Sequence, residues 1–294
     1  MNELRLLETI HPDKDVDATY NRLVGIDEHK QCLLDELVAQ LRPERLTAWI
    51  KKYHPSGLAL AQRWQHSTPL VLLSGEVGCG KTALAGSIGT PLAREIDRRV
   101  VTMETPSDLR GWGHVGELSA RVTEAFAQAR RRSKDIGAGL LVIDEADDVA
   151  TARAQNQAHH EDRAGLNVLI KQVDQLARAK DPLVVLLITN RHLVLDPAVR
   201  RRAALHLVFK RPDARAREAV FTAMFDGVTD IRGRVQDIVA ASAGTVPFSF
   251  SDLTDRLGRA VLRAAHHRDV PVTIDLVLAC IANIEPSPLM EDGA

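Results

Sequence analysis

Five short apolar runs constrain the fold of this chain more than any other feature. They are PLVLLS, RVVTM, GLLVID, LVVLLIT and LHLVF, at residues 69–74, 99–103, 139–144, 183–189 and 205–209. Each run is continuous rather than alternating, which is typical of strands buried on both faces of a parallel sheet. Apolar residues recur at helical spacing between the runs, as at Leu118, Val122, Ala125, Phe126 and Ala129. We therefore expect an α/β fold with a five-stranded parallel sheet flanked by helices.

The pattern changes after Pro212, where the strand-like runs stop. The remaining segments have helical periodicity, including DARAREAVFTAMF and SDLTDRLGRAVLRAAHH. We predict an N-terminal arm over residues 1–20, a large α/β domain over 21–211 and a small all-α domain over 212–294.

Composition and charge exclude several classes of protein. The 294 residues carry 38 Lys and Arg against 39 Asp and Glu, a net charge of −1, and this balance argues against a protein that mainly clamps nucleic acid. Three widely spaced cysteines fit neither a disulfide framework nor a zinc site. The charged N-terminus MNELRLLETIHPDKDV has no signal-peptide core, and no apolar run is long enough to span a bilayer. We expect a cytoplasmic protein without a membrane partner.

The segment GEVGCGKT follows the first apolar run and opens a helical segment, which is the context of a phosphate-binding loop. Glycines allow backbone N–H groups to converge on an anion, and the helix N-terminus adds positive potential. Lys81 is expected to reach the β- and γ-phosphates, and Thr82 to bind Mg²⁺. The alternative is a chance match in a turn. The predicted nucleotide-binding residues here are Gly75, Glu76, Val77, Gly78, Cys79, Gly80, Lys81, Thr82 and Ala83.

Acidic and amide side chains end two further apolar runs. Asp144 and Glu145 follow GLLVI, and Asn190 follows LVVLLIT. Ligands bind at the carboxyl ends of parallel strands, so we expect Asp144 to hold Mg²⁺, Glu145 to activate the attacking water and Asn190 to orient it. The alternatives are acids that cap a helix and an asparagine that forms a turn. The chain lacks the Asn-Lys-x-Asp element of guanine selectivity, which favours ATP.

Taken in order, these motifs and the C-terminal helical segment resemble an AAA+ ATPase over roughly residues 20–285. In that superfamily a segment like LVGIDEHKQCLLDEL lies near adenine, so the resemblance implies that Val24, Gly25 and Ile26 flank the base. It also implies that Arg202, or else Arg201, acts on the γ-phosphate of a neighbouring subunit in a homo-hexamer. The alternative is that this basic cluster is a solvated turn.

The segment from IDEADDVATAR to LLITN is similar to the pachytene-checkpoint AAA+ remodellers of HORMA-domain proteins. Short bacterial members of that family accompany HORMA proteins and cyclic-oligonucleotide synthases in anti-phage operons. The resemblance implies that this chain uses ATP to disassemble a HORMA-domain complex, with or without a bound synthase. Such a protein would be a negative regulator of anti-phage signalling.

The same resemblance assigns the glycine-rich stretch RGWGHVGELS to a pore loop that grips a peptide. Its predicted substrate-contacting residues are Trp112, Gly113, His114, Val115 and Gly116. The alternative is that Trp112 packs onto the domain. Many AAA+ proteins place an arginine at the start of the third helix of the small domain, and here that position holds Ser251, which leaves Arg256, Arg259 or no residue for that role.

Two other functions remain open from the sequence. One is a DNA-directed AAA+ ATPase, such as a loader or a transposition regulator, although the chain shows no clear basic surface for it. The other is an ATP-binding scaffold without hydrolysis. The set of Lys81, Asp144, Glu145 and Asn190 argues against that scaffold.

Overall fold

The computed structural model describes residues 4–64, 67–106, 116–146, 160–191 and 195–289. The chain divides into two compact units. The large unit comprises Met1–Tyr20, Glu28–Ser74 and Thr82–Val208. The small unit comprises Asn21–Asp27, Gly75–Lys81 and Phe209–Ala294. The domain boundaries given above from the sequence stay predictions.

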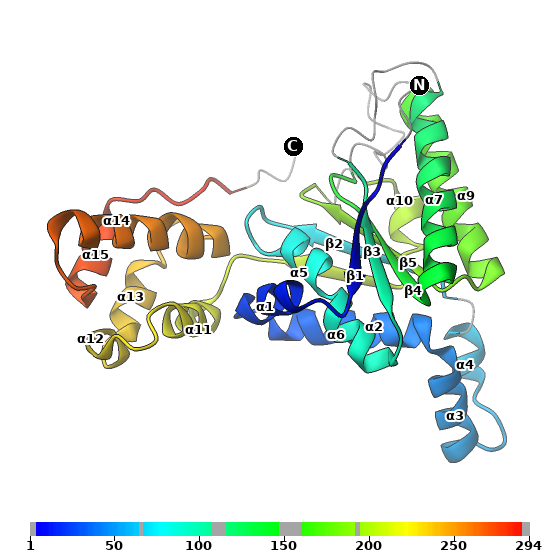
Figure 1. Ribbon diagram of the computed structural model, residues 1–294, viewed down its shortest axis with the longest axis horizontal. Coiled ribbons are helices and arrows are strands. Elements are labelled where there is room, and N and C mark those ends of the chain that lie inside the picture. The colour runs from blue at the N-terminus through cyan, green and yellow to red at the C-terminus, as the bar shows by residue number, and fades with distance from the viewer. Residues whose placement is uncertain (1–3, 65–66, 107–115, 147–159, 192–194, 290–294) are drawn as a thin grey trace. The chain divides into compact units, whose positions relative to one another are not determined.

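A six-stranded sheet forms the centre of the large unit, in the order β1-β3-β4-β5-β2-β6 (Figure 1). The α/β prediction is confirmed, and each of the five apolar runs forms a strand. The strands are β1 (Leu7–His11), β2 (Leu70–Gly75), β3 (Val100–Glu104), β4 (Ala138–Ile143), β5 (Leu183–Thr189) and β6 (Leu205–Phe209).

The expected strand count was wrong by one. Residues 7–11 form the edge strand β1, which pairs antiparallel with β3, from Leu7 opposite Glu104 to His11 opposite Val100. The sequence LETIH is not a continuous apolar run, because an edge strand buries little of its surface. The other edge strand, β6, also departs from the expected pattern, since its buried and exposed residues alternate toward Phe209. Burial on both faces is therefore restricted to β2, β3, β4 and β5.

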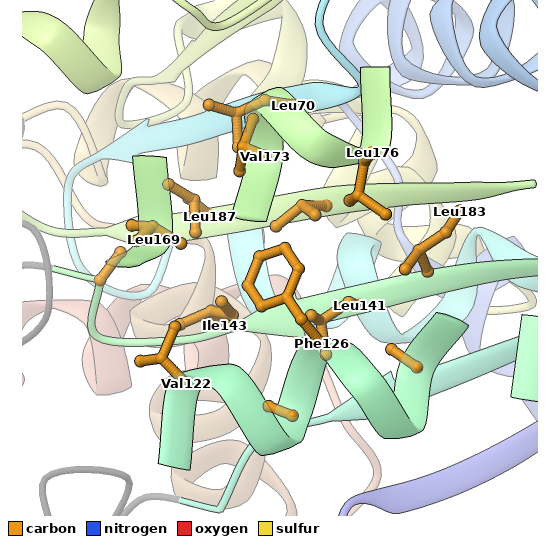
Figure 2. Close-up of a cluster of buried hydrophobic side chains, with 14 of the residues drawn as sticks. Leu70, Val122, Phe126, Leu141, Ile143, Leu169, Val173, Leu176, Leu183 and Leu187 are labelled. Atoms are coloured by element: carbon orange, nitrogen blue, oxygen red, sulfur yellow. The ribbon is translucent and has the colours of Figure 1, made fainter. Parts of the chain in front are cut away.

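Two long helices cover one face of this sheet and form the core with it. They are α7 (Glu117–Ile136) and α9 (His160–Ala179), which pack against each other. The Phe126 ring of α7 lies beside Leu141 and Ile143 of β4 (Figure 2). Every apolar residue that the sequence assigns to the core face of α7 is buried, so that periodicity is confirmed. This packing fixes the strand ends that carry the candidate site.

Shorter helices complete the large unit and the segments that lead into it. They are α1 (Lys14–Arg22), α2 (Asp27–Leu41), α3 (Pro43–Tyr53), α4 (Ala59–Trp64), α5 (Lys81–Ser87), α6 (Gly89–Ile96) and α10 (Pro197–Arg200). Helix α2 buries Leu33, Leu37 and Leu41, which recur at helical spacing along one of its faces. Helix α6 belongs to the face that packs on β3 and β1.

The described part of the small unit contains helices and no strand of its own apart from the ends of β2 and β6. Its helices are α11 (Ala214–Met224), α12 (Thr229–Arg232), α13 (Val235–Ala241), the π-helix η1 (Asp252–Leu257), α14 (Gly258–Arg268) and α15 (Ile274–Ala282). Asp213 caps α11 by accepting the Ala216 N–H at 2.8 Å. Phe221, Leu253 and Val277 are fully buried in the core of this unit.

Candidate nucleotide-binding site

The predicted phosphate loop joins β2 to α5, and its backbone turns at two glycines. Gly78 has a φ of 70° and Gly80 a φ of 91°. Both values lie in the left-handed region, which glycine adopts at little steric cost. Left-handed residues among right-handed ones direct successive N–H groups to one side, the geometry of an anion nest. The loop backbone therefore suits a phosphate group.

The start of the loop is fixed against β6. A Cβ atom on Gly75 would lie 2.0 Å from the carbonyl oxygen of Phe209, so no larger residue fits there. The Glu76 N–H donates to that same carbonyl at 3.0 Å. The first residues of the loop thus have their position set by a neighbouring strand rather than by the loop alone.

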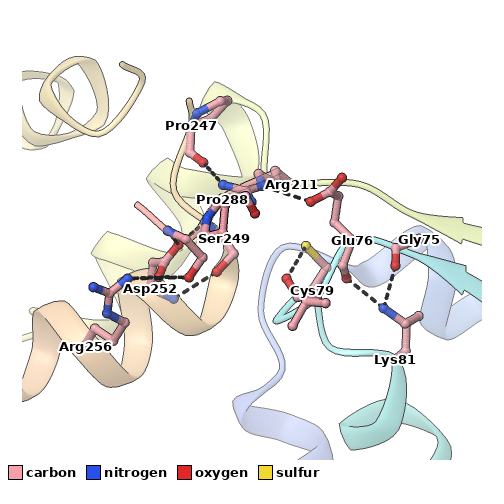
Figure 3. A network of polar contacts seen from close by, with 12 residues as sticks. Gly75, Glu76, Cys79, Lys81, Arg211, Pro247, Ser249, Asp252, Arg256 and Pro288 are labelled. Atoms are coloured by element: carbon pink, nitrogen blue, oxygen red, sulfur yellow. Dashed lines mark hydrogen bonds and ion pairs between the residues drawn. The ribbon is translucent and has the colours of Figure 1, made fainter. Parts of the chain in front are cut away.

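Lys81 is the first residue of α5, and its side chain turns back onto the loop. Its Nζ donates to the carbonyl oxygens of Gly75 at 2.8 Å and Glu76 at 2.7 Å (Figure 3). Only 5% of the residue is exposed. The ammonium group is therefore held beside the loop backbone, where an anion in the nest would meet it.

The large unit carries the candidate metal ligands. The Thr82 hydroxyl donates to Asp144 Oδ2 at 2.7 Å, and Asp144 Oδ1 accepts the Glu145 N–H at 2.8 Å. Thr82 and Asp144 are both exposed. Hydroxyl and carboxylate oxygens at the end of a strand are the donors that Mg²⁺ prefers, since it keeps several of its waters. The donor set fits a magnesium ion bound together with nucleotide phosphates.

Glu145 follows Asp144 directly and has an unusual backbone. Its φ is 52°, in the left-handed region that non-glycine residues rarely adopt. A residue is kept in such a conformation only where its surroundings determine it, at a cost on the order of 1 kcal/mol. Its side chain is exposed. The exposed Glu145 side chain therefore lies at the carboxyl end of the sheet, two residues after the end of β4.

Asn190 comes directly after β5, which lies between β4 and β2 in the sheet. The residue is half-buried. The hydroxyl of its neighbour Thr189, itself buried, accepts the Arg191 N–H at 2.9 Å and so orders the end of the strand. The structure thus sets Asn190 and Asp144 at the same edge of the sheet.

The segment expected near adenine lies in the small unit. Gly25 has a φ of 83°, and a Cβ there would lie 3.1 Å from the Phe250 ring and 3.2 Å from Ala216. Ile26 is 5% exposed, with its Cδ1 3.6 Å from the place of a Cβ on Gly80. Val24 is half-buried. An apolar segment thus lies beside the phosphate loop, as a flat base requires.

The two candidate arginines differ in their surroundings. Arg202 donates from Nε to Asp174 Oδ1 at 2.9 Å and from a terminal nitrogen to Oδ2 at 3.2 Å. The Asp174 carboxylate raises the pKa of the Arg202 guanidinium further above its ordinary value. Arg201 is exposed. Arg202 must therefore exchange a bidentate ion pair before it can bind another group, whereas Arg201 forms no ion pair with the residues that the structure describes.

The expected pore loop is mostly outside the described residues. Trp112, Gly113, His114 and Val115 fall there. Gly116 is described: its φ is 83°, and its carbonyl accepts the Ala120 N–H at 3.0 Å at the start of α7.

Two polar residues that the sequence did not indicate lie at the candidate site. Glu104 ends β3, and burial, together with the Asp144 charge, raises the pKa of its carboxyl. The sequence could have indicated Glu104, because it is an acidic residue that directly follows the predicted strand at 99–103. Arg211 forms an ion pair with Glu76 in the phosphate loop at 3.3 Å. No local pattern indicates that pair.

Comparison with known proteins decides the family. A family model described as "ATPase family associated with various cellular activities (AAA)" matches residues 71–211. A CD-NTase-associated protein 6 of Escherichia coli strain MS 115-1 is 38% identical over 293 residues, covering 96% of this chain and 94% of that protein. This chain belongs to that family of AAA ATPases. Membership implies that it binds nucleotide.

Two solved structures have the same fold. One is the "Structure of E. coli MS115-1 HORMA:CdnC:Trip13 complex", in which the matching chain is 36% identical with a TM-score of 0.92, and 98% of each chain is covered. The other is the "Structure of Rhizobiales Trip13", which is 33% identical with a TM-score of 0.76 and covers 96% of this chain and 98% of that one. Among the described residues, no helix has the length and apolar character needed to cross a membrane.

Proposed function

We propose that this chain is a cytoplasmic ring ATPase that uses ATP hydrolysis to remodel a HORMA-domain protein bound to a CD-NTase, and that it thereby switches off anti-phage signalling. The observation that carries the proposal is the TM-score of 0.92 over nearly the whole chain to a protein of a HORMA:CdnC:Trip13 complex. The relative named CD-NTase-associated protein 6 supports the same partners. The loop and strand-end residues of an ATPase are all present in the chain.

Binding of the triphosphate is the task of the loop and of α5. The nest formed around Gly78 and Gly80 would receive the β-phosphate, and the Lys81 ammonium would bridge the β- and γ-phosphates. Thr82 and Asp144 would hold a magnesium ion, which neutralises charge on the phosphate oxygens. Val24, Gly25 and Ile26 would flank the base.

Hydrolysis needs a base and a correctly placed water. The exposed Glu145 carboxylate would accept a proton from the water that attacks the γ-phosphate. The Asn190 amide would orient that water from the next strand end. Charge that develops on the γ-phosphate would be neutralised by Arg201 or Arg202 of a neighbouring subunit in a hexamer. Arg201 is an exposed residue, whereas Arg202 is held by Asp174, so we place Arg201 first in that role.

The experiment that tests this function uses Glu145→Gln, which keeps the shape of the side chain but removes the base. We expect hydrolysis to fall about 100-fold or more, while ATP binding persists. Purified Glu145→Gln protein with ATP should then retain a HORMA-domain protein, with or without its CD-NTase, on an affinity column. Lys81→Ala is the matched control, because without the ammonium the ATP-bound state cannot form.

The outcomes separate the proposal from its rivals. Retention of the HORMA protein by Glu145→Gln, together with its loss in Lys81→Ala, supports the remodelling function. Retention of DNA in place of protein would replace it with a DNA-directed ATPase. If Glu145→Gln hydrolyses ATP as fast as the wild type, Glu145 is not the base.

A further inference from the structure

Arg211 lies two residues after the end of β6 and has an environment that is unusual for an arginine. Only 6% of its side chain is exposed. Its Nε faces Glu76 Oε2 at 3.3 Å, and its two terminal nitrogens donate to the carbonyl oxygens of Pro247 and Pro288, each at 2.6 Å (Figure 3). A buried guanidinium is tolerated only where its N–H groups find acceptors. Here the acceptors come from three separate segments of the small unit.

Glu76 connects this arginine to the phosphate-binding lysine. Its carboxylate faces Arg211, while its backbone carbonyl accepts the Lys81 Nζ at 2.7 Å. A single residue of the loop is therefore held through its side chain by Arg211 and through its backbone by Lys81. A movement of Arg211 would shift the carbonyl that orients the Lys81 ammonium.

The segment that contains Pro288 is itself anchored on the small unit. Asp252 is fully buried and accepts the Ser287 hydroxyl at 2.7 Å and the Ser287 N–H at 3.1 Å. Arg256 donates to the same carboxylate at 2.7 Å. The Pro288 carbonyl is thus held in place by the residue that precedes it, and so it presents a fixed acceptor to Arg211.

Asp252 also belongs to the helix start that contacts the loop. It accepts the Ser249 N–H at 3.0 Å, while the Ser249 hydroxyl accepts the Asp252 N–H at 3.1 Å, which forms a capping box. In the same turn the Ser251 N–H donates to the Gly78 carbonyl at 2.9 Å. The loop is therefore held at Gly78 by a helix start and at Glu76 by Arg211.

We propose that Arg211 is a positioning residue for ATP binding, through which the C-terminal segment at residues 287–288 sets the conformation of the phosphate loop. The inference rests on the proposed ATP site and adds a specific link to it. A segment outside the site then tunes the affinity for nucleotide, because its carbonyl group is one of the three acceptors that hold the arginine. Arg211 does not touch the nucleotide and acts through Glu76.

The test measures the Kd of the full-length protein for a fluorescent ATP analogue, with the melting temperature as a check of folding. Arg211→Gln removes the charge and the fork of donors, and we expect its Kd to rise about tenfold. Glu76→Gln should give a similar rise, and the double variant should be no worse than either one. Arg211→Lys keeps the charge with one of three contacts, so its Kd should lie between those of the wild type and Arg211→Gln.

The part played by the C-terminal segment is tested with Ser287→Ala. This variant removes the hydroxyl bond to Asp252 and should raise the Kd about threefold in the wild-type background, but not in Arg211→Gln. Arg234→Gln is the matched control, because it removes an exposed ion pair with Asp237 in the same unit. Its Kd should equal that of the wild type.

Each result shows whether Arg211 couples residues 287–288 to the phosphate loop. A wild-type Kd in Arg211→Gln, or effects of Ser287→Ala and Arg211→Gln that multiply, would overturn the inference and leave the ATP site intact. Failure of the wild-type protein to bind the analogue would remove the ATP site itself. Should Arg211→Gln not fold, the comparison of Arg211→Lys with Arg234→Gln decides the question in the same way.

Discussion

Both units have an apolar interior, and in the small unit buried charges lie next to the phosphate loop. In the large unit, strands buried on both faces pack against α7, and Phe126 lies within an entirely apolar cluster. The small unit also has an apolar core, around Phe221, but beside it lie the fully buried Asp252 and the nearly buried Arg211. Apolar contacts are many and individually weak, whereas a buried charge depends on a few directional bonds.

This difference fits the tasks that the units carry. A sheet held by dispersed apolar contacts keeps its strand ends in place, and Asp144, Glu145 and Asn190 sit on those ends. In the small unit, Asp252 and Arg211 together bind the phosphate loop, the start of η1 and the C-terminal segment. The loss of a single one of these bonds can therefore change the conformation of the loop. The residues proposed to bind and activate water thus lie in the large unit, and the residues proposed to position the loop lie in the small unit.

The largest predicted change in the free energy of unfolding, and the one that best compares the two apolar cores, is expected at Phe126. Phe126→Ala should reduce the free energy of unfolding by about 4–5 kcal/mol, because the sheet and two helices around it cannot collapse into the cavity. Phe221→Ala in the smaller helical core should cost about 3 kcal/mol, since short helices adjust more readily. Guanidinium unfolding followed by circular dichroism measures both.

The control for that pair is Leu262→Ala, a residue of α14 that is 66% exposed. Its effect should be within about 0.5 kcal/mol of zero. Equal losses for Phe126→Ala and Phe221→Ala would show that both cores resist collapse to the same degree, and the first half of the comparison would fail.

The next effect concerns the buried charge of the small unit. Asp252→Asn keeps the size of the side chain but weakens the bonds from Ser287 and Arg256, so we expect a loss of about 1.5–3 kcal/mol. Hydrogen exchange should increase in η1 and around residue 287, and not in β4 or β5. Asp226→Asn is the control, since its ion pair with Arg232 is exposed and should contribute less than about 0.5 kcal/mol. Uniform exchange across both units would contradict the prediction.

The sequence predicts those parts of the molecule whose cause is local. β5 begins and ends at the predicted residues, because a continuous apolar run is itself the condition for burial between two strands. The pair of Thr82 and Asp144 was also predictable, since phosphate chemistry fixes the residue types in both motifs. The role of each residue still depends on the experiments above.

Features that depend on distant partners were not predictable. β1 exists because residues 7–11 find β3 about ninety positions away, and its own residues have no strand pattern. Arg211 and Glu76 are 135 positions apart, and neither one lies in a motif that requires the other. Only the fold brings these groups together, so a reading of local periodicity misses them.

A smaller effect on the free energy of unfolding is expected as the pH is lowered, and it arises in the large unit rather than in the small one. His11 is fully buried in the large unit between the hydroxyls of Thr90 and Thr102, each at 2.9 Å, and burial lowers its pKa below the ordinary 6.5, against the opposing charge of Asp13. Below pH 6.5 the unfolded chain therefore binds a proton that the folded chain does not. Stability should fall by up to about 1 kcal/mol per pH unit as the pH drops through this range.

Asp252 should contribute nothing to that change. Its bonds from Ser287, Ser249 and Arg256 hold its pKa well below the ordinary 3.8 in spite of burial, so its stabilisation persists above that value and is lost only as the pH falls below it. Unfolding of the wild type and of His11→Gln between pH 7.5 and pH 5.5 tests the assignment. An unchanged slope in His11→Gln would mean that another group causes the loss.

The smallest effect compares one cysteine from each unit. Cys79 lies in the phosphate loop, 1% exposed, and burial raises the pKa of its thiol to about 11, although Lys81 opposes that shift. Cys32 on α2 is exposed. Since the thiolate is the reactive form, iodoacetamide at pH 7.5 should modify Cys32 and leave Cys79 intact, with no change in ATP affinity. Peptide mass spectrometry measures this directly. Rapid modification of Cys79 in the folded protein would mean that the loop opens readily, and that the contacts of Arg211 and Ser251 do not hold it closed.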